Sequence, residues 1–297
     1  MKFDVVCFGS AVVDALVETD AKEVNGYIMF PHECKMLVKN LCFEIGGGGT
    51  NTAVAFSRLG LRTGYIGKIG NDKNGGSVLD LLKNEKISFL GKKISGKTSG
   101  FSVVLISKER HRSILTYKGI NDTIESDDVK NFETDWLYFS SMMKKSFRTQ
   151  LALAKKFKKN GTKIAFNPSE YIIGKEDLNP LLKICDVLIL NKEEAELLTK
   201  EKDKLKGIHN LGPKIVVITD ERNAVYCYDG KKTYSINPPK VKIADKTGAG
   251  DAFSAGFVAG LIKNKPIDFC LNLGVKEAIS TIKYLGAKNN LLRMKLR

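Results

Sequence analysis

The sequence has few of the residues that build metal centres and hydrolytic sites. It contains six cysteines in 297 residues, and no two of them have the Cys-x-x-Cys spacing of a zinc or redox site. Most cysteines stand in apolar segments, which is typical of small core residues. The three histidines lie far from any Gly-x-Ser-x-Gly motif, so a serine-hydrolase triad is not indicated. These residues are Cys7, Cys34, Cys42, Cys185, Cys227, Cys270, His32, His111 and His209.

Long apolar runs are also missing. No segment approaches the roughly 20 consecutive apolar residues that a membrane-spanning helix needs. Asp4 and Asp14 interrupt the one apolar stretch near the N-terminus, so no signal peptide is predicted. We therefore expect a cytoplasmic protein with no membrane partner.

Acidic residues are scarce relative to basic ones, since 33 Asp and Glu face 48 Lys and Arg, for a net charge of +15. Such a surplus occurs in nucleic-acid-binding proteins. Here the lysines are scattered, as in 155–159, where they form the exposed face of an amphipathic helix, and the sequence has no basic tail. We expect no nucleic-acid partner, and the charge equally suits an anionic nucleotide.

The composition and the order of the predicted strands and helices are those of an ordinary globular α/β protein. The chain is 43% hydrophobic and 27% charged, and its length suffices for one large α/β domain or two small ones. Between 136 and 219, short apolar segments rich in β-branched residues alternate with segments of helical period. This alternation predicts an α/β fold with a parallel sheet and right-handed crossovers.

The most informative stretch is 242–260, which begins polar and becomes an apolar helix rich in alanine and glycine. Gly248, Ala249 and Gly250 stand where this helix begins. Unpaired backbone N–H groups and the helix dipole make such a terminus an anion site, which glycine lets the anion approach closely. Asp251 would place a carboxylate beside the anion, an arrangement suited to phosphoryl transfer to a hydroxyl. The alternative is a glycine-rich loop followed by an ordinary first-turn acid.

A second glycine-rich stretch, 43–60, also runs into an amphipathic helix and contains Gly-Gly-Gly-Gly-Thr-Asn. It resembles the Gly-Gly-x-x-x-Asn signature of the ribokinase-like (PfkB) family of sugar and nucleoside kinases. The segment 245–253, Asp-Lys-Thr-Gly-Ala-Gly-Asp-Ala-Phe, is similar to that family's second signature. The resemblance spans nearly the whole chain and implies a doubly wound, mostly parallel sheet with a small β-sheet lid. The implied lid comprises 15–41 and 95–119, and the implied nucleotide- and substrate-binding core comprises 1–14, 42–94 and 120–297.

On the acceptor side, the resemblance implies that Asp14 binds a substrate hydroxyl. It also implies that Gly46 and Gly47 let the backbone approach the substrate, and that Asn51 supplies a bidentate amide. Without the resemblance, Asp14 fits an ordinary turn aspartate equally well. Thr50 or Asn51 likewise fits a simple helix cap.

On the donor side, the segment 191–194, Asn-Lys-Glu-Glu, resembles the family's Asn-x-x-Glu motif. The resemblance implies that Asn191 approaches the phosphates of ATP. Glu194 would act on Mg²⁺ through water, because Mg²⁺ prefers oxygen ligands and keeps several waters. The alternative is a helix N-terminus whose acids interact favourably with the helix dipole. Further implied positions are Thr219 for the nucleotide, and Asp245 with the Thr247 carbonyl for a monovalent cation such as K⁺.

Some positions depart from the family pattern. Val12 stands where the family's ribokinases carry an asparagine, which argues against ribose as the acceptor. Glu221 and Ala224 stand where members usually have glycines beside the nucleotide, which motivates a non-catalytic alternative. The segment 91–98 matches the P-loop pattern Gly-x-x-x-x-Gly-Lys-[Ser/Thr], but a strand-like segment follows where a P-loop requires a helix.

The sequence thus predicts an ATP-dependent kinase that transfers the γ-phosphoryl group to a hydroxymethyl group of a sugar. In this prediction Asp251 takes the proton of the acceptor, and the N–H groups of 248–250 stabilise the charge of the transferred group. The alternatives are a nucleoside kinase of the same fold and a non-catalytic nucleotide- or sugar-binding relative. The exposed edges of the lid sheet predict a homodimer formed through the lid.

Overall fold

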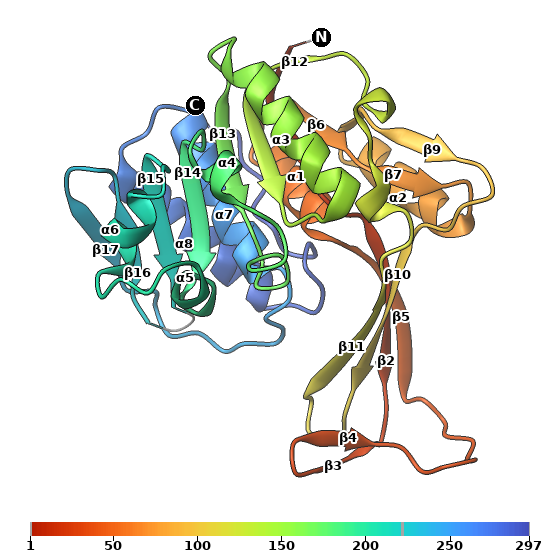
Figure 1. Cartoon of the computed structure of the whole chain (residues 1–297). Helices are drawn as coiled ribbons and strands as arrows, with labels where there is room; N and C mark the ends of the chain where they lie inside the picture. The colour runs from red at the N-terminus through yellow and green to blue at the C-terminus, as the bar shows by residue number, and fades with distance from the viewer. Residues whose placement is uncertain (1, 221–222, 297) are drawn as a thin grey trace.

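The core is organised around one sheet. In the computed structural model, which describes residues 2–220 and 223–296, this sheet has nine strands in the order β17-β16-β15-β14-β13-β12-β1-β6-β8 (Figure 1). Every neighbouring pair from β15 to β8 is parallel, whereas β16 and β17 form an antiparallel edge. The strands are β1 (Lys2–Phe8), β6 (Thr63–Ile66), β8 (Ser88–Phe89), β12 (Glu133–Ser140), β13 (Lys163–Asn167), β14 (Val187–Asn191), β15 (Ile215–Thr219), β16 (Val225–Tyr228) and β17 (Thr233–Ile236).

The strand order reverses beside β1. The chain builds outward from β1 through β6 to β8, returns to β12 on the other side of β1, and continues through β13 to β15. The sheet is therefore doubly wound, and the predicted fold class is confirmed. Ligands of such sheets bind outside the carboxyl ends of the strands at the point of reversal.

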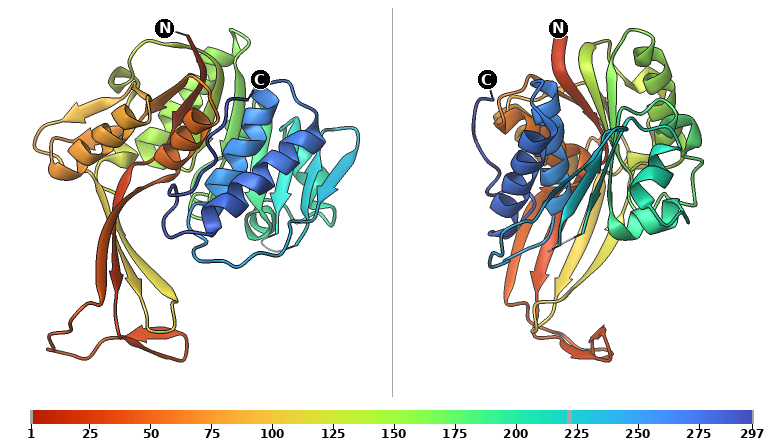
Figure 2. Two further views of the ribbon diagram at one scale, coloured as in Figure 1. Left: turned by 180° about the vertical axis from the view of Figure 1, so that it is seen from behind. Right: turned by 90° about the vertical axis from the view of Figure 1, so that its left-hand side faces the viewer.

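Helices cover both faces of the sheet, as Figure 2 shows. The strands are apolar on both sides for this reason, and β14 reads Val-Leu-Ile-Leu before its last residue. On one face lie α1 (Gly48–Arg58), α2 (Lys73–Asn84), α7 (Ala249–Ile262) and α8 (Ile267–Ile282). On the other face lie α3 (Lys144–Lys158), α4 (Asn179–Leu182), α5 (Lys192–Leu198) and α6 (Lys204–His209). No helix in the described part of the chain combines the length and the apolar character needed to cross a membrane.

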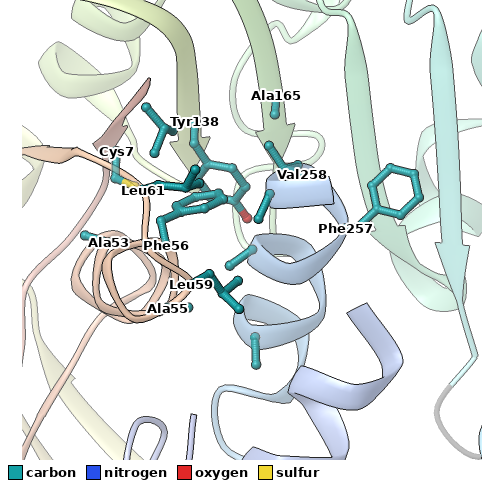
Figure 3. Close-up of a cluster of buried hydrophobic side chains, with 14 of the residues drawn as sticks. Cys7, Ala53, Ala55, Phe56, Leu59, Leu61, Tyr138, Ala165, Phe257 and Val258 are labelled. Atoms are coloured by element: carbon teal, nitrogen blue, oxygen red, sulfur yellow. The ribbon is translucent and has the colours of Figure 1, made fainter. Parts of the chain in front are cut away.

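The packing of α1 beside α7 determines where the functional site forms. Phe56 of α1 and Leu59, the C-cap of that helix, meet Val258 of α7 and Tyr138 of β12 in the buried cluster drawn in Figure 3. The rings of Phe56 and Tyr138 lie edge to face, with centroids 5.5 Å apart. Because both helices begin at the carboxyl edge of the sheet, this packing brings their N-termini together.

The helix α7 also packs very closely on α8. A Cβ built at Gly256 would lie 2.9 Å from the Cα of Gly274 and 2.9 Å from the carbonyl oxygen of Leu273. These neighbours are backbone atoms, which cannot move aside without separating the helices. The small residues of α7 are therefore required by the helix–helix contact as well as by the turn that precedes them.

A second sheet of four strands, ordered β11-β10-β2-β5, projects from the core (Figure 1). Its strands β10 and β2 are parallel, and the two outer pairs are antiparallel. The strands are β2 (Val12–Glu18), β5 (Asn40–Gly46), β10 (Gly100–Ile106) and β11 (Arg112–Tyr117). This small sheet thus reaches beyond the segments 15–41 and 95–119, because β2 begins at Val12 and β5 ends at Gly46.

Short elements complete the described chain. The segment 91–98 contains strand β9 and a turn at Gly96 with φ of 68°, and it continues into β10, the strand that the sequence predicted after the P-loop-like pattern. The remaining elements are the hairpin strands β3 (Lys22–Val24) and β4 (Tyr27–Met29), the pair β7 (Lys68–Gly70) and β9 (Lys92–Ile94), and the 3-10 helices η1 (Asn121–Thr123) and η2 (Ser126–Asp128).

The close contact between α7 and α8 yields a stability prediction. Gly256→Ala should lower the free energy of unfolding by about 1–3 kcal/mol, because the new methyl group forces two packed backbones apart. Gly76→Ala is the matched control, since Gly76 lies in α2 and a Cβ there would meet nothing within 4 Å. The control should raise stability by roughly 0.5–1 kcal/mol. Urea unfolding followed by circular dichroism measures both, and a neutral Gly256→Ala would contradict the packing described here.

Candidate functional site

Two helix N-termini meet at the carboxyl edge of the sheet, and each begins at a glycine with positive φ. The N-cap of α1 is Gly47, with φ of 95°, where a Cβ would lie 2.4 Å from the carbonyl oxygen of Ser10. The N-cap of α7 is Gly248, with φ of 75°, where a Cβ would lie 2.5 Å from the Cβ of Ala287. Both turns therefore exclude other residues by conformation and by space. Neither Thr50 nor Asn51 caps α1 through its side chain, so the helix-cap alternative for them is wrong.

The N-terminus of α7 opens on a cavity of about 210 Å³. Gly248 and Gly250 line it, and a Cβ at Gly250 would meet no atom within 4 Å. The N–H of Ala249 instead donates to the carbonyl of Lys246 at 3.2 Å, and Ala249 is not among the lining residues. Of the residues 248–250, only Gly248 and Gly250 therefore line the cavity, and the N–H of Ala249 is already hydrogen-bonded.

The same cavity gathers the residues that the sequence assigned to the donor. Asn191, Glu194 and Thr219 line it together with Asp251, from the ends of β14 and β15 and the first turns of α5 and α7. Ser254 also lines it, and its buried hydroxyl has no hydrogen-bond partner among the described residues. Helix-end amides and a free hydroxyl suit the phosphate groups of a nucleotide.

Asp251 lies between the two helix ends. Its Oδ2 accepts a hydrogen bond of 2.7 Å from Nδ2 of Asn51, and its Oδ1 lies 3.4 Å from the Cβ position of Gly48. Burial raises the pKa of Asp251, while the Asn51 hydrogen bond and the charge of Lys288 act in the opposite direction. The hydrogen bond from Asn51 and the charge of Lys288 thus favour the ionised form of this carboxyl group.

Lys288 is a site residue that the sequence analysis missed. It is only 6% exposed, and its ammonium group donates to Oδ1 of Asn51 and, at 3.4 Å, to the hydroxyl of Thr50. Because Lys288 engages the amide oxygen of Asn51, the amide nitrogen faces Asp251. Burial lowers the pKa of Lys288 to about 8, against the opposing charges of Asp251, Asp14 and Glu44.

The C-terminal segment brings Lys288 into place. Nη1 of Arg58 donates to the carbonyl of Lys288 at 2.5 Å, and the same guanidinium pairs with Glu85. The N–H groups of Met294 and Leu296 donate to the end of α1. The segment is thereby fixed along α1, which carries the partners of Lys288.

Asp14 reaches the site from the small sheet. It lies on β2 opposite Glu44 of β5, and a Cβ at Gly46 would fall 2.0 Å from its Oδ2, so only glycine leaves this carboxylate in place. Burial raises the pKa of Asp14, whereas a hydrogen bond from Ser102 and the charge of Lys288 lower it. Asp14 thus lies against Gly46, and the charges of both Asp14 and Asp251 act on Lys288, which bonds to Asn51.

Asn191 and Glu194 cap α5 together. Oδ1 of Asn191 accepts from the N–H of Glu194 at 2.7 Å, and Oε2 of Glu194 accepts from the N–H of Asn191 at 2.8 Å. Both residues therefore stabilise the N-terminus of α5, as the structural alternative expected. Both also line the cavity, so the two roles are compatible. Burial raises the pKa of Glu194 to about 6.

The carboxylates near the cavity could hold Mg²⁺ only through water molecules. Among residues 2–220 and 223–296, no group of three His, Cys, Asp or Glu side chains could hold a metal ion. Glu194 is a single, mostly buried carboxylate already bonded to an amide. This matches an ion that keeps several waters and takes most other ligands from substrate phosphates.

The position expected for a monovalent cation is different. Oδ1 of Asp245 accepts a hydrogen bond from Nη1 of Arg112 at 2.5 Å, and the same nitrogen donates to the Thr247 hydroxyl at 2.6 Å. A guanidinium therefore already neutralises the carboxylate that a K⁺ ion would need. The residues at this position do not fit a K⁺ ion in addition to Arg112.

Two other features lie outside this arrangement. Ala224 directly precedes β16, whereas Glu221, its companion at the usual glycine positions, lies outside the described residues. A larger cavity of about 520 Å³ lies at the amino ends of β1 and β12, beside Lys2 and Glu133. That edge is opposite the one at which doubly wound sheets bind ligands.

The structure thus combines a doubly wound α/β sheet with a helix N-terminus that lies beside a buried carboxylate at the carboxyl edge of the sheet. The pfkB family of carbohydrate kinases matches residues 2–293. The chain therefore belongs to this family, whose members are phosphotransferases acting on hydroxyl groups of sugars, and the resemblance noted in the sequence is confirmed.

Individual relatives agree with the family assignment. The chain is 29% identical over 247 residues to an uncharacterized sugar kinase of Archaeoglobus fulgidus, covering 81% of this chain and 99% of that protein. It is 28% identical over 266 residues to a ribokinase of Haemophilus influenzae, covering 85% of this chain and 86% of the ribokinase.

Solved structures show the same fold at low sequence identity. An adenosine kinase from Sinorhizobium meliloti superposes with a TM-score of 0.82 at 20% identity, covering 97% of this chain and 96% of that one. A ribokinase from Thermotoga maritima superposes with a TM-score of 0.81 at 20% identity, covering 98% and 96%. The fold is thus that of ribokinase, and it is shared by sugar and nucleoside kinases.

The contacts of Lys288 generate a prediction about pH dependence. In the wild type, kcat/KM should fall as pH rises through about 8, because the ammonium that orients Asn51 loses its proton. Lys288→Met should lower kcat by up to roughly 10²-fold and lack this alkaline limb, because Asn51 would no longer be held in the orientation that bonds to Asp251. Lys288→Arg should keep its charge to higher pH.

Steady-state kinetics between about pH 6 and pH 10 tests this prediction. Lys295→Met, a change at an exposed lysine of the same C-terminal segment, serves as the control and should follow the wild-type profile. An unchanged alkaline limb in Lys288→Met would show that Lys288 does not act on the site.

Proposed function

We propose that this protein is an ATP-dependent kinase that transfers the γ-phosphoryl group to a hydroxymethyl group of a sugar. The observation that carries the proposal is the position of Asp251, which lines the cavity at the N-terminus of α7 while Asn51 holds its carboxylate at 2.7 Å. A carboxylate beside helix-end amides can receive the proton of an alcohol that attacks a bound phosphate. Because ATP is the donor, we also place the reaction in the cytoplasm.

In the proposed reaction, the acceptor oxygen forms a bond to the γ-phosphorus, and the bond from that phosphorus to the β–γ bridging oxygen breaks. ADP leaves with the electron pair, and the hydroxyl proton moves to Asp251. The amides around Gly248 and Gly250 stabilise the charge on the transferred group. Mg²⁺, held near Glu194 through water, would offset the charge of the donor phosphates.

The acceptor pocket is proposed to lie between α1 and the small sheet. Asp14 would accept a hydrogen bond from a substrate hydroxyl, and Gly46 and Gly47 would let the backbone approach the sugar. Val12, buried at the start of β2, offers no hydrogen bond where an asparagine would, which argues against ribose. The small sheet would act as a lid that excludes water from the transfer.

A nucleoside acceptor is the second candidate. The adenosine kinase of Sinorhizobium meliloti shares the fold at the same level of similarity as the ribokinase. A panel of free sugars, sugar phosphates and nucleosides, assayed with ATP and Mg²⁺, separates the two classes. Turnover on none of them would favour a non-catalytic binding protein.

The role of Asp251 is tested on the best acceptor of that panel. Asp251→Asn should lose at least ~10³-fold in kcat, because the amide cannot take the proton, while folding and ATP binding persist. The matched control is Asp80→Asn, which changes an exposed aspartate on α2 and should leave kcat unchanged. Activity of Asp251→Asn close to that of the wild type would remove Asp251 from the mechanism.

We also propose that two copies of the chain associate through the small sheet. The face of that sheet opposite Asp14 carries the row Phe43, Ala15, Val103 and Leu115, in which Phe43 and Leu115 are each 62% exposed. An exposed apolar face of this kind is typical of an interaction site, and a two-fold axis would bring the same face of two copies into contact.

Analytical ultracentrifugation tests the dimer. Leu115→Glu should raise the dimer dissociation constant at least roughly tenfold, because it buries a charge in the apolar contact. Leu197→Glu, which changes a 48% exposed leucine on α5, should have no effect. A wild-type protein that stays monomeric at high concentration would contradict this proposal.

A further inference from the structure

The loop that leads into α7 is held by one buried carboxylate. Asp245 is 2% exposed, and its Oδ1 accepts from the N–H of Thr247 at 2.7 Å while its Oδ2 accepts from the N–H of Gly286 at 2.9 Å. The N–H groups of Ala244 and Asp245 donate in turn to the carbonyl of Ile282 at the end of α8. These bonds fix the loop against the C-terminal part of the core.

Arg112 adds an anchor from the small sheet. It is the first residue of β11, and its Nη1 donates to both Oδ1 of Asp245 and the hydroxyl of Thr247, at 2.5 and 2.6 Å. The Arg112 side chain is itself only 21% exposed. One guanidinium thus ties the edge strand of the small sheet to the loop that begins α7.

The charge balance of this contact leaves no anionic site for another ion. Burial pushes the pKa of Asp245 upward, but the hydrogen bonds from Arg112 and from the Gly286 and Thr247 amides hold it below its ordinary value. Arginine stays protonated at every physiological pH. Removing Arg112 would therefore leave a buried carboxylate that keeps two amide hydrogen bonds but has lost its counter-charge, which is unfavourable.

We infer that the Arg112 guanidinium replaces a monovalent cation at Asp245, so that the protein needs no K⁺ and Arg112 acts as a positioning residue for the N-terminus of α7. The positive charge that holds the loop before α7 in place thus comes from Arg112 of the small sheet. The expected effect of Arg112 on kcat rests on the proposed function, because it is measured as turnover. The expected effect of Arg112 and K⁺ on Tm does not rest on it, because thermal stability is measured without a substrate.

Potassium titrations on the full chain test the inference. In wild type, replacing tetramethylammonium by K⁺ at constant ionic strength should leave both Tm and kcat unchanged. Arg112→Ala should lower Tm and reduce kcat roughly tenfold in tetramethylammonium, and K⁺ should restore most of both, because the freed carboxylate can then bind the ion. Arg112→Lys should show a smaller loss and a smaller K⁺ response, since it keeps a charge without the second hydrogen bond.

The matched control is Arg110→Ala. Arg110 pairs with Glu18 on the exposed end of the same sheet and does not touch Asp245, so its removal should create no K⁺ response. A wild type that requires K⁺, or an Arg112→Ala variant whose Tm and kcat stay low in saturating K⁺, would overturn the inference. Should Arg112→Ala fail to fold, the wild-type titration and Arg112→Lys decide between the same outcomes. If the protein turns over no acceptor, the Tm measurements alone test whether Arg112 replaces the cation. Their outcome does not depend on the kinase assignment.

Discussion

The site depends on the hydrogen bond between Asn51 and Asp251, which joins the first turns of two helices that are 200 residues apart in sequence. This bond can form only because α1 and α7 lie side by side on one face of the sheet and begin at its carboxyl edge. The turns that begin the two helices depend on glycine, since a Cβ at Gly47 would clash with Ser10 and a Cβ at Gly248 would clash with Ala287. The N-termini of both helices therefore lie beside one carboxylate, Asp251.

The electrostatics of the site follow from this convergence. Three carboxylates, Asp14, Glu44 and Asp251, surround a single buried ammonium group, Lys288. Burial acts on the pKa values of Asp14, Asp251 and Lys288 so as to favour their neutral forms, and their mutual attraction opposes it. The charge of Lys288 therefore favours the ionised forms of Asp14 and Asp251, which burial alone would disfavour.

Much of this could be predicted from sequence because the relevant residues are local to motifs. The glycines and Asp251 stand in one short segment whose polarity changes at a helix start, and Asn191 and Glu194 form a recognisable capping pair. The alternation of strands and helices predicted the parallel sheet, and the family resemblance implied that the sheet is doubly wound. Ala249 was placed among the anion-binding amides on the same reasoning, but its N–H closes a turn with Lys246.

Lys288 and Arg112 could not be predicted in the same way. Lys288 contacts Asn51 across 237 residues, and Arg112 contacts Asp245 across 133 residues. Each comes from a segment with no motif of its own, and in a sequence with 48 basic residues neither stands out. Only the path of the C-terminal segment along α1, and of β11 toward the α7 loop, brings these cations to buried carboxylates.

The central claim is that the N-terminus of α7 binds the phosphoryl group while Asp251 faces the acceptor. The most direct test is a crystal structure with a non-hydrolysable ATP analogue, Mg²⁺ and the acceptor. The account predicts the γ-phosphate within hydrogen-bond distance of the amides around Gly248 and Gly250, and an acceptor hydroxyl next to the Asp251 carboxylate. A γ-phosphate bound elsewhere, or an acceptor hydroxyl remote from Asp251, would contradict it.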